Sequence, residues 1–177
     1  MAGCGTTKPV PGLVATIGVH DWDLDSFLMA LSGLERPFVL DVRQRRGVRG
    51  PQYAWANAQR LQRALAAAGI PYRHVRDLAP TTELRQLQYA EDERAGVGKR
   101  SREVLADAYR ERYVREILDR ADLGRLLAAL EEDGLGALLC VEADPRACHR
   151  SLIADRLAAE HGYEVVHLRP RYDAARG

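Results

Sequence analysis

The stretch LLCVEADPRACHRSLIADRL, residues 138–157, contains an apolar run that passes through a proline turn into a helical pattern. The run before Glu142 is typical of a buried strand, and Asp144-Pro145 marks a turn. The pattern over 149–162 is helical and stops at a glycine. A strand followed at once by a helix is the repeating unit of a parallel sheet that helices cover.

The same alternation extends outward in both directions. Short apolar runs predict strands over 13–19, 36–42, 70–75, 136–143 and 164–168. Helical spacing predicts helices over 21–34, 55–68 and 149–162. A densely charged segment, 82–132, predicts an inserted pair or trio of helices with breaks near 95–98 and 121–124. We therefore expect one three-layer α/β domain over 1–177, with a mostly parallel sheet of about five strands and helices on both faces. Residues 1–12 and 170–177 are expected to form a loose head and a tail.

Composition narrows the class of protein. The net charge is +1, so a general polyanion-binding surface is excluded and any basic surface must be a local patch. No run approaches the roughly 18 apolar residues of a membrane helix, and the N-terminus lacks the apolar core of a secretion signal. We expect a cytoplasmic protein without a membrane partner.

The three cysteines form no CxxC, which favours reduced thiols over a disulfide framework or a structural zinc site.

Ligands of parallel α/β folds bind beyond the carboxyl ends of the strands, where loops converge with helix N-termini. Four such ends should meet in this chain, and they carry residues 18–21, 41–49, 74–77 and 142–150. The candidate site is therefore expected at that edge.

Several of these segments resemble an uncharacterised bacterial family, domain of unknown function 488. The resembling segments are "TIG", "LDVR", "GIPYRHV", "LLCVEADPRACHRSLIADRL" and "VVHL", and CHRS is the most specific part. The chain departs from the family pattern at residues 20–22, where the family more often has a small polar residue. The resemblance covers nearly the whole chain and implies the fold class, but no settled reaction.

The CHRS segment supplies most of the candidate catalytic groups. Cys148, His149, Arg150 and Ser151 fall at the first turn of a helix, where the dipole favours an anion and lowers the pKa of a thiol. We interpret Glu142, Cys148 and His149 as catalytic, with Glu142 or His149 transferring protons, and Arg150 and Ser151 as substrate-binding. The alternative is that these residues cap the turn or pack inertly.

The end of the second strand adds an acid and a basic loop. Asp41 and Arg43 lie on the same side of the strand because side chains alternate with period two. We interpret Asp41 as catalytic and Arg43 and Arg49 as phosphate-binding, since the guanidinium fork matches a phosphate group. The alternatives are an ion pair that pins the loop and a solvated basic surface.

Further substrate contacts are predicted from the segment after the basic loop, the third strand and the charged insert. Interleaved cations and aromatic rings can bind nucleic acid by phosphate pairing and base stacking. An amphipathic cover helix with exposed ion pairs is the alternative. The candidates are Tyr53, Tyr72, His74, Gln88, Tyr89, Lys99 and Arg100.

Three functions remain open. The first is an enzyme, such as a hydrolase or glycosylase, that acts on a nucleotide or nucleic acid. The second is rhodanese-like sulfur transfer through Cys140 or Cys148, although nine residues separate Cys140 from the Arg150-Ser151 pair. The third is an anion-binding module without turnover. No Walker loop or GxGxxG is present, which argues against ATP hydrolysis and a standard NAD site. No compact metal-ligand spacing is present either, so neither a metal nor a cofactor is predicted. The oligomeric state is not predicted.

Overall fold

Five parallel strands form the central sheet in the order β3-β2-β4-β1-β5, as the computed structural model shows for residues 12–98, 101–132 and 134–170. Ala15 on β1 is paired with Ala137 on β4, and Asp41 on β2 is paired with Leu139. The strands are β1 (Leu13–Ile17), β2 (Pro37–Asp41), β3 (Tyr72–His74), β4 (Leu135–Leu139) and β5 (Glu164–His167). This sheet confirms the predicted α/β class.

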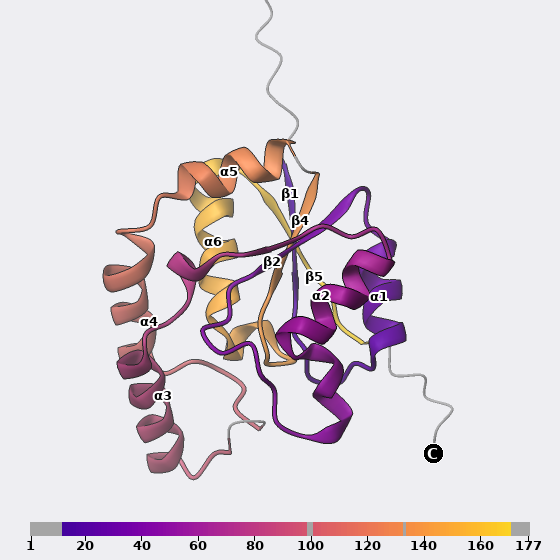
Figure 1. Cartoon of the computed structure of the whole chain (residues 1–177). Coiled ribbons are helices and arrows are strands. Elements are labelled where there is room, and N and C mark those ends of the chain that lie inside the picture. Colours follow the sequence, from indigo (N-terminus) through magenta and orange to yellow (C-terminus); the bar gives the residue numbers. More distant parts are fainter. Residues whose placement is uncertain (1–11, 99–100, 133, 171–177) are drawn as a thin grey trace, which may run out of the picture.

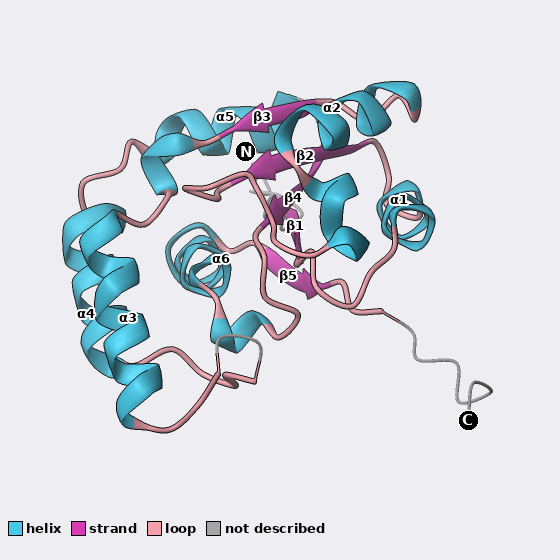
Figure 2. Ribbon diagram, turned by 60° about the horizontal axis from the view of Figure 1, so that its bottom comes forward, coloured by secondary structure: helices cyan, strands magenta, loops and turns pink. Residues whose placement is uncertain are grey.

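Helices cover both faces of the sheet. Figure 1 shows α1 and α2 on one side of the strands and α4, α5 and α6 on the other, and Figure 2 shows the same separation from a second direction. The helices are α1 (Leu24–Ser32), α2 (Ala58–Ala67), α3 (Thr82–Arg94), α4 (Asp107–Tyr113), α5 (Leu123–Glu132) and α6 (His149–His161). The three predicted layers are therefore present.

Strand alternation divides the buried residues into two cores. Leu138 and Cys140 pack with residues of α4 and α6, whereas Ala137 and Leu139 pack with residues of α1 and α2. Successive side chains of a strand point to opposite faces, so a strand buried on both faces must be apolar at nearly every position. The continuous apolar runs of the sequence follow from this requirement.

The charged segment 82–132 forms three α-helices. Thr81 caps α3 by accepting a hydrogen bond from Leu84 N at 3.2 Å. The chain after α4 continues as a π-helical turn, Val114–Leu118. The Tyr113 hydroxyl donates to the Leu78 carbonyl at 2.6 Å, which fastens α4 to the segment after β3. Breaks occur between α3 and α4 and before α5, as the sequence predicted.

Two predicted elements differ most from the structure, while the others are shorter than predicted by up to three residues at an end. The fourth strand ends at Leu139 rather than at 143, because Val141 O accepts hydrogen bonds from Val19 N and His20 N in the loop after β1. The helix predicted over 55–68 is divided into a 3-10 turn, Pro51–Ala56, and α2. Asn57 separates them in an extended conformation and accepts a hydrogen bond from Val48 N.

The predicted head and tail lie almost entirely outside the described residues. Among the described residues, no helix combines the length and apolarity needed to cross a membrane.

Candidate active site at the carboxyl edge of the sheet

A cavity of about 380 Å³ opens at the carboxyl ends of the strands. The loops after β1, β2 and β4 contribute to its walls, together with α3 and the segments before α4 and α6. Its lining contains five arginines and a single carboxylate among the described residues. These charged residues are Arg43, Arg45, Arg49, Arg85, Arg102 and Glu142. Two of the arginines, Arg43 and Arg102, are paired with carboxylates, and the other three give the cavity a charge that favours an anion.

The loop after β4 is held by a close backbone approach and a buried arginine. A Cβ atom on Gly18 would lie 1.9 Å from Glu142 O, so only glycine allows this approach. The Arg150 guanidinium donates to Glu142 O at 2.6 Å and to Ala143 O at 2.9 Å. Arg150 has no exposed surface and does not line the cavity. Its position fixes the loop that carries Glu142.

Two thiols and an imidazole converge on the inner wall of the cavity. His149 Nδ1 lies 3.7 Å from Cys140 Sγ and 3.9 Å from Cys148 Sγ. His149 Nε2 lies 3.0 Å from Val42 O, which can only accept, so Nε2 carries the proton in the neutral ring. In this neutral form Nδ1 presents its lone pair to the two sulfur atoms, whereas in the charged form it donates a hydrogen bond to them.

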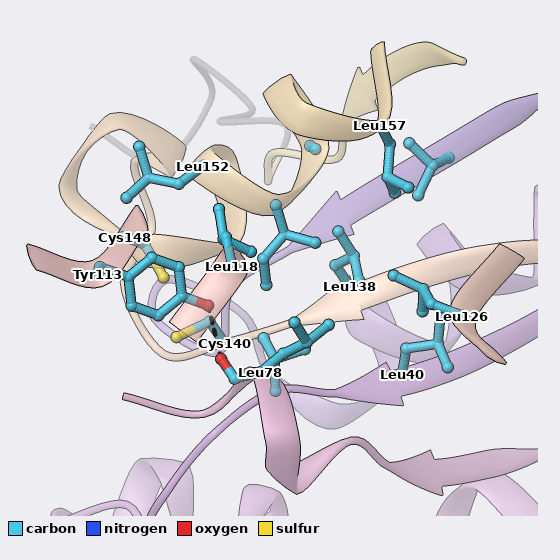
Figure 3. Close-up of a cluster of buried hydrophobic side chains, with 14 of the residues drawn as sticks. Leu40, Leu78, Tyr113, Leu118, Leu126, Leu138, Cys140, Cys148, Leu152 and Leu157 are labelled. Atoms are coloured by element: carbon cyan, nitrogen blue, oxygen red, sulfur yellow. Dashed lines mark hydrogen bonds between the residues drawn. The ribbon is translucent and has the colours of Figure 1, made fainter. Parts of the chain in front are cut away.

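The same two thiols close one end of the apolar cluster against α4 and α6. Figure 3 shows Cys140 and Cys148 beside the ring of Tyr113. Burial tends to raise the pKa of Cys148, but the hydrogen bond from Cys140 and the charges of Arg150 and His149 outweigh it and lower this pKa well below its usual value. Burial and the neighbouring Cys148 thiolate raise the pKa of Cys140. Cys148 is therefore the thiol that ionises first.

Glu142 stands between the thiols and an arginine. Its carboxylate lies 3.5 Å from Cys140 Sγ and accepts a hydrogen bond from Arg102 Nη2 at 3.1 Å. Arg102 also pairs with Asp92 at 2.7 Å and donates to the Ala147 carbonyl, so it joins α3 to the turn before α6. Burial, followed by the charge of Cys148, raises the pKa of Glu142 to about 7, although Arg102 opposes this rise.

Asp41 and Arg43 form a buried bidentate ion pair. Arg43 Nε and Nη2 donate to the two Asp41 oxygens at 2.8 and 2.7 Å, and Nη1 donates to Ala56 O. The Tyr72 hydroxyl donates to Asp41 at 2.6 Å. Asp41 has no exposed surface and does not line the cavity, whereas Arg43 lines it with 2% exposure. This is the loop-pinning geometry that sequence analysis kept as an alternative.

Some of the remaining residues predicted to contact the substrate line the cavity, and others do not. Gln88, Tyr89 and Arg49 line the cavity together with Glu142, Cys148 and His149. Four other candidates do not line it: Tyr53, Tyr72, His74 and Ser151. His74 bonds the Arg43 carbonyl, Ser151 bonds the Cys148 carbonyl, and Tyr53 packs against His20. Lys99 and Arg100 lie outside the described residues.

Sequence reasoning did not select Arg85 or Arg102 for the site. Arg85 donates to Gln44 Oε1 and to the Tyr89 hydroxyl, and its guanidinium carbon lies 5.6 Å from the Tyr89 ring centroid. Arg102 follows the predicted cationic residues Lys99 and Arg100 in the sequence, but it meets Glu142 across 40 positions of the chain. No local pattern indicates such a pairing.

The fold and the cavity define a class: an α/β protein with an all-parallel sheet and an arginine-rich pocket at its carboxyl edge. The chain belongs to the family described as Domain of unknown function DUF488, whose family model matches residues 23–157. The match includes the CHRS segment and confirms the resemblance drawn from it. Searches among curated proteins and solved structures found no similar protein, so the similarity to rhodaneses remains unsupported.

Proposed function

We propose that the protein is an enzyme acting on a nucleotide, either free or at the end of a nucleic acid strand. The charge of the cavity carries this proposal, because Arg45, Arg49 and Arg85 line it in addition to the two arginines that are paired with carboxylates. Its volume of about 380 Å³ suits a small ligand, for which protein sites usually measure about 300–1,000 Å³. Guanidinium groups bind phosphate through paired hydrogen bonds, so a phosphate is the anion that this lining favours.

Three of the arginines are assigned to the phosphate. Arg45 and Arg49 are exposed on the loop after β2, and Arg85 reaches the cavity from α3. Sequence analysis predicted that Arg43 and Arg150 bind the phosphate. Both guanidinium groups already donate hydrogen bonds to protein acceptors, and both residues are nearly or fully buried. In this proposal they position the loops after β2 and β4.

We assign binding of the nucleotide base to the wall of the cavity that contains Tyr89 and Tyr109. Tyr89 and Tyr109 line the cavity on the side of α3 and α4. The Tyr89 ring lies next to the Arg85 guanidinium. The ring offers a surface on which a base can stack, and the guanidinium offers hydrogen-bond donors for a phosphate close to that base. Tyr109 is held at a ring separation of 6.0 Å from Tyr113. Gln88 contributes the amide of this wall, although it is already bonded to Asp92 and Ala106 N.

Proton transfer is assigned to Glu142. Its side chain retains 24% exposure where it borders the cavity, and it is the carboxylate nearest the thiols. Acid–base catalysis needs a group within hydrogen-bond reach of the substrate, and Glu142 meets this condition better than His149. Both ring nitrogens of His149 face protein atoms, Val42 O on one side and the sulfurs on the other.

Sulfur transfer through Cys140 or Cys148 is the competing candidate. The lowered pKa of Cys148 favours it, since the thiolate is the reactive form. Against it, Cys140 and Cys148 are only 4% and 1% exposed, and a persulfide needs access to its acceptor. Thiosulfate turnover with cyanide, lost in Cys148→Ser, would favour this candidate over nucleotide chemistry.

Calorimetric titration of the full chain with nucleoside 5′-phosphates and with the matching nucleosides tests the binding step. We expect the phosphates to bind more tightly and Arg45→Gln to weaken them about tenfold, which corresponds to one lost hydrogen bond to a charged group. Arg63→Gln is the matched control, because Arg63 is an exposed arginine on α2 that does not line the cavity. Equal effects of the two substitutions, or equal affinity for nucleosides, would contradict the proposal.

Turnover is tested with Glu142→Gln, which keeps the size of the side chain and removes its proton-transfer capacity. We expect this variant to bind nucleoside phosphates with nearly unchanged affinity and to release no product from them. Wild-type protein that binds nucleotides without converting any of them would instead be an anion-binding module, and the enzymatic part of the proposal would fail.

A further inference from the structure

The cluster of Cys140, Cys148 and His149 has the composition and spacing of a metal site. One ligand atom from each residue lies within 4.8 Å of the other two, and all three residues are buried. Cys140 follows β4 directly, whereas Cys148 and His149 begin α6 after a turn. The strand–turn–helix geometry therefore brings together ligands that are separated in the sequence by seven residues, 141–147.

The distances agree with tetrahedral coordination. Zn–S bonds of about 2.3 Å and Zn–N bonds of about 2.0 Å place neighbouring ligand atoms about 3.5–3.8 Å apart. The two sulfur-to-nitrogen distances here are 3.7 and 3.9 Å. These two distances are slightly longer than the roughly 3.5 Å expected between a sulfur and a nitrogen bound to one tetrahedral zinc ion. The two sulfur atoms lie within 4.8 Å of each other, against about 3.8 Å for two zinc-bound sulfurs. Closing the three atoms around an ion therefore requires shifts of no more than about 1 Å.

The surroundings of His149 orient it as a ligand. Metal-bound histidines usually donate their second ring N–H to a carbonyl or carboxylate, which fixes the tautomer and the ring plane. His149 Nε2 makes this bond to Val42 O at 3.0 Å, so that Nδ1 faces the sulfurs. The ring also packs against Tyr113 at a centroid distance of 5.3 Å. The His149 ring is therefore already oriented for metal binding by its contacts with Val42 and Tyr113.

Charge also favours a cation at this point. Two thiolates and a neutral imidazole would carry two negative charges into a buried wall, where a divalent ion cancels them. Thiolate and imidazole together form a donor set suited to zinc. We propose that Cys140, Cys148 and His149 bind one Zn²⁺ ion, with a fourth coordination position open toward the cavity.

The open position would lie next to Glu142. Its carboxylate is 3.5 Å from Cys140 Sγ but lies outside the group of mutually close ligand atoms. Catalytic zinc sites keep three protein ligands and one exchangeable water, and a nearby carboxylate that is not a ligand often transfers the proton of that water. Zinc binding does not depend on the nucleotide proposal, but it would supply the water that Glu142 deprotonates there.

Cobalt substitution and thiol counting test the site without an activity assay. The full chain, reduced and treated with a chelator, is titrated with Co²⁺ and then with Zn²⁺. We expect one equivalent of Co²⁺ to produce thiolate charge-transfer bands and tetrahedral d–d bands, which one equivalent of Zn²⁺ abolishes. Zinc should also protect two of the three cysteines from alkylation.

Matched variants identify the ligands. Cys148→Ser should raise the Kd for zinc by more than about 100-fold, since loss of an outer partner alone costs about 10–100-fold. Cys4→Ser is the control, because the proposed ligands do not include Cys4, and it should leave the Kd unchanged. His149→Asn should retain bands of altered energy and reduced intensity, which distinguishes loss of a ligand from loss of the fold. Circular dichroism of each metal-free variant verifies folding.

Three outcomes would overturn the proposal: folded, reduced wild-type protein that gives no cobalt bands, bands that survive Cys148→Ser, or thiols that only form a disulfide. Zinc binding with no affinity for nucleoside phosphates would leave the metal site standing and remove the proposed function instead.

Discussion

Replacing Arg43 by methionine tests whether this residue is part of the scaffold or part of the phosphate site. The substitution keeps a long side chain but removes three hydrogen bonds, two to Asp41 and one to Ala56 O. The Asp41 carboxylate would remain fully buried and would still accept hydrogen bonds from the Tyr72 hydroxyl and from the backbone N–H of residue 43. We therefore expect a large loss of stability.

The size of the loss follows from the burial of the pair. Removing one partner of a buried ion pair costs about 3–5 kcal/mol, because the other charge is left uncompensated. A domain has about 5–15 kcal/mol of stability in total, so the variant would be marginal. With a urea m value of about 1–3 kcal/mol per molar, the unfolding midpoint should fall by about 1–5 M.

Urea unfolding followed by circular dichroism measures this shift. Arg45→Met is the control: Arg45 is exposed two residues further along the same loop, and its substitution should change stability by less than about 0.5 kcal/mol. The double variant Asp41→Leu, Arg43→Met should be more stable than Arg43→Met alone, since it buries no unpaired charge. A midpoint unchanged in Arg43→Met, with nucleotide binding abolished, would refute the scaffold role and return Arg43 to the phosphate.

Two further substitutions test how the site is held. Gly18→Ala should lower the melting temperature more than Gly69→Ala does, because the new Cβ would lie 1.9 Å from Glu142 O. At Gly69 a Cβ would meet open space, and only the φ of +70° would destabilise alanine, by about 1 kcal/mol. Equal melting temperatures would show that the loop after β4 can move away. Tyr113→Phe removes the hydrogen bond of 2.6 Å to Leu78 O and should cost about 1–3 kcal/mol in urea unfolding. A loss below about 0.3 kcal/mol would mean that water replaces the hydroxyl.

Much of the fold could be predicted from the chain alone. Every predicted strand exists. The central strands β1, β2 and β4 are buried on both faces and therefore require apolar runs, which are visible without knowledge of their partners. The edge strands β3 and β5 are less buried and were predicted from shorter apolar runs. The start of α6 at His149 was also predictable, since a turn at Asp144-Pro145 precedes it and Gly162 ends it. The end of β4 was not, because Val141 leaves the ladder for a loop partner after β1.

The partners of the site residues could likewise not be predicted from the sequence, because they come from other segments of the chain. Period-two alternation correctly placed Asp41 and Arg43 on one side of β2, but whether Arg43 faces a ligand or a carboxylate depends on Ala56 O and the Tyr72 hydroxyl, which come from other elements. Spacing alone also argued against a metal at CHRS. The convergence of Cys140, Cys148 and His149 becomes visible only when α6 turns back over the end of β4.

Local sequence therefore determined which segments become strands and helices, and which chemical groups stand at the carboxyl edge of the sheet. Tertiary structure alone decided the partners of those groups: His149 meets Val42 across 107 positions, and Arg102 meets Glu142 across 40. The reason is physical. Burial of apolar side chains imposes a period on each segment by itself, whereas a hydrogen bond or an ion pair depends on a second segment whose position only the packed chain defines.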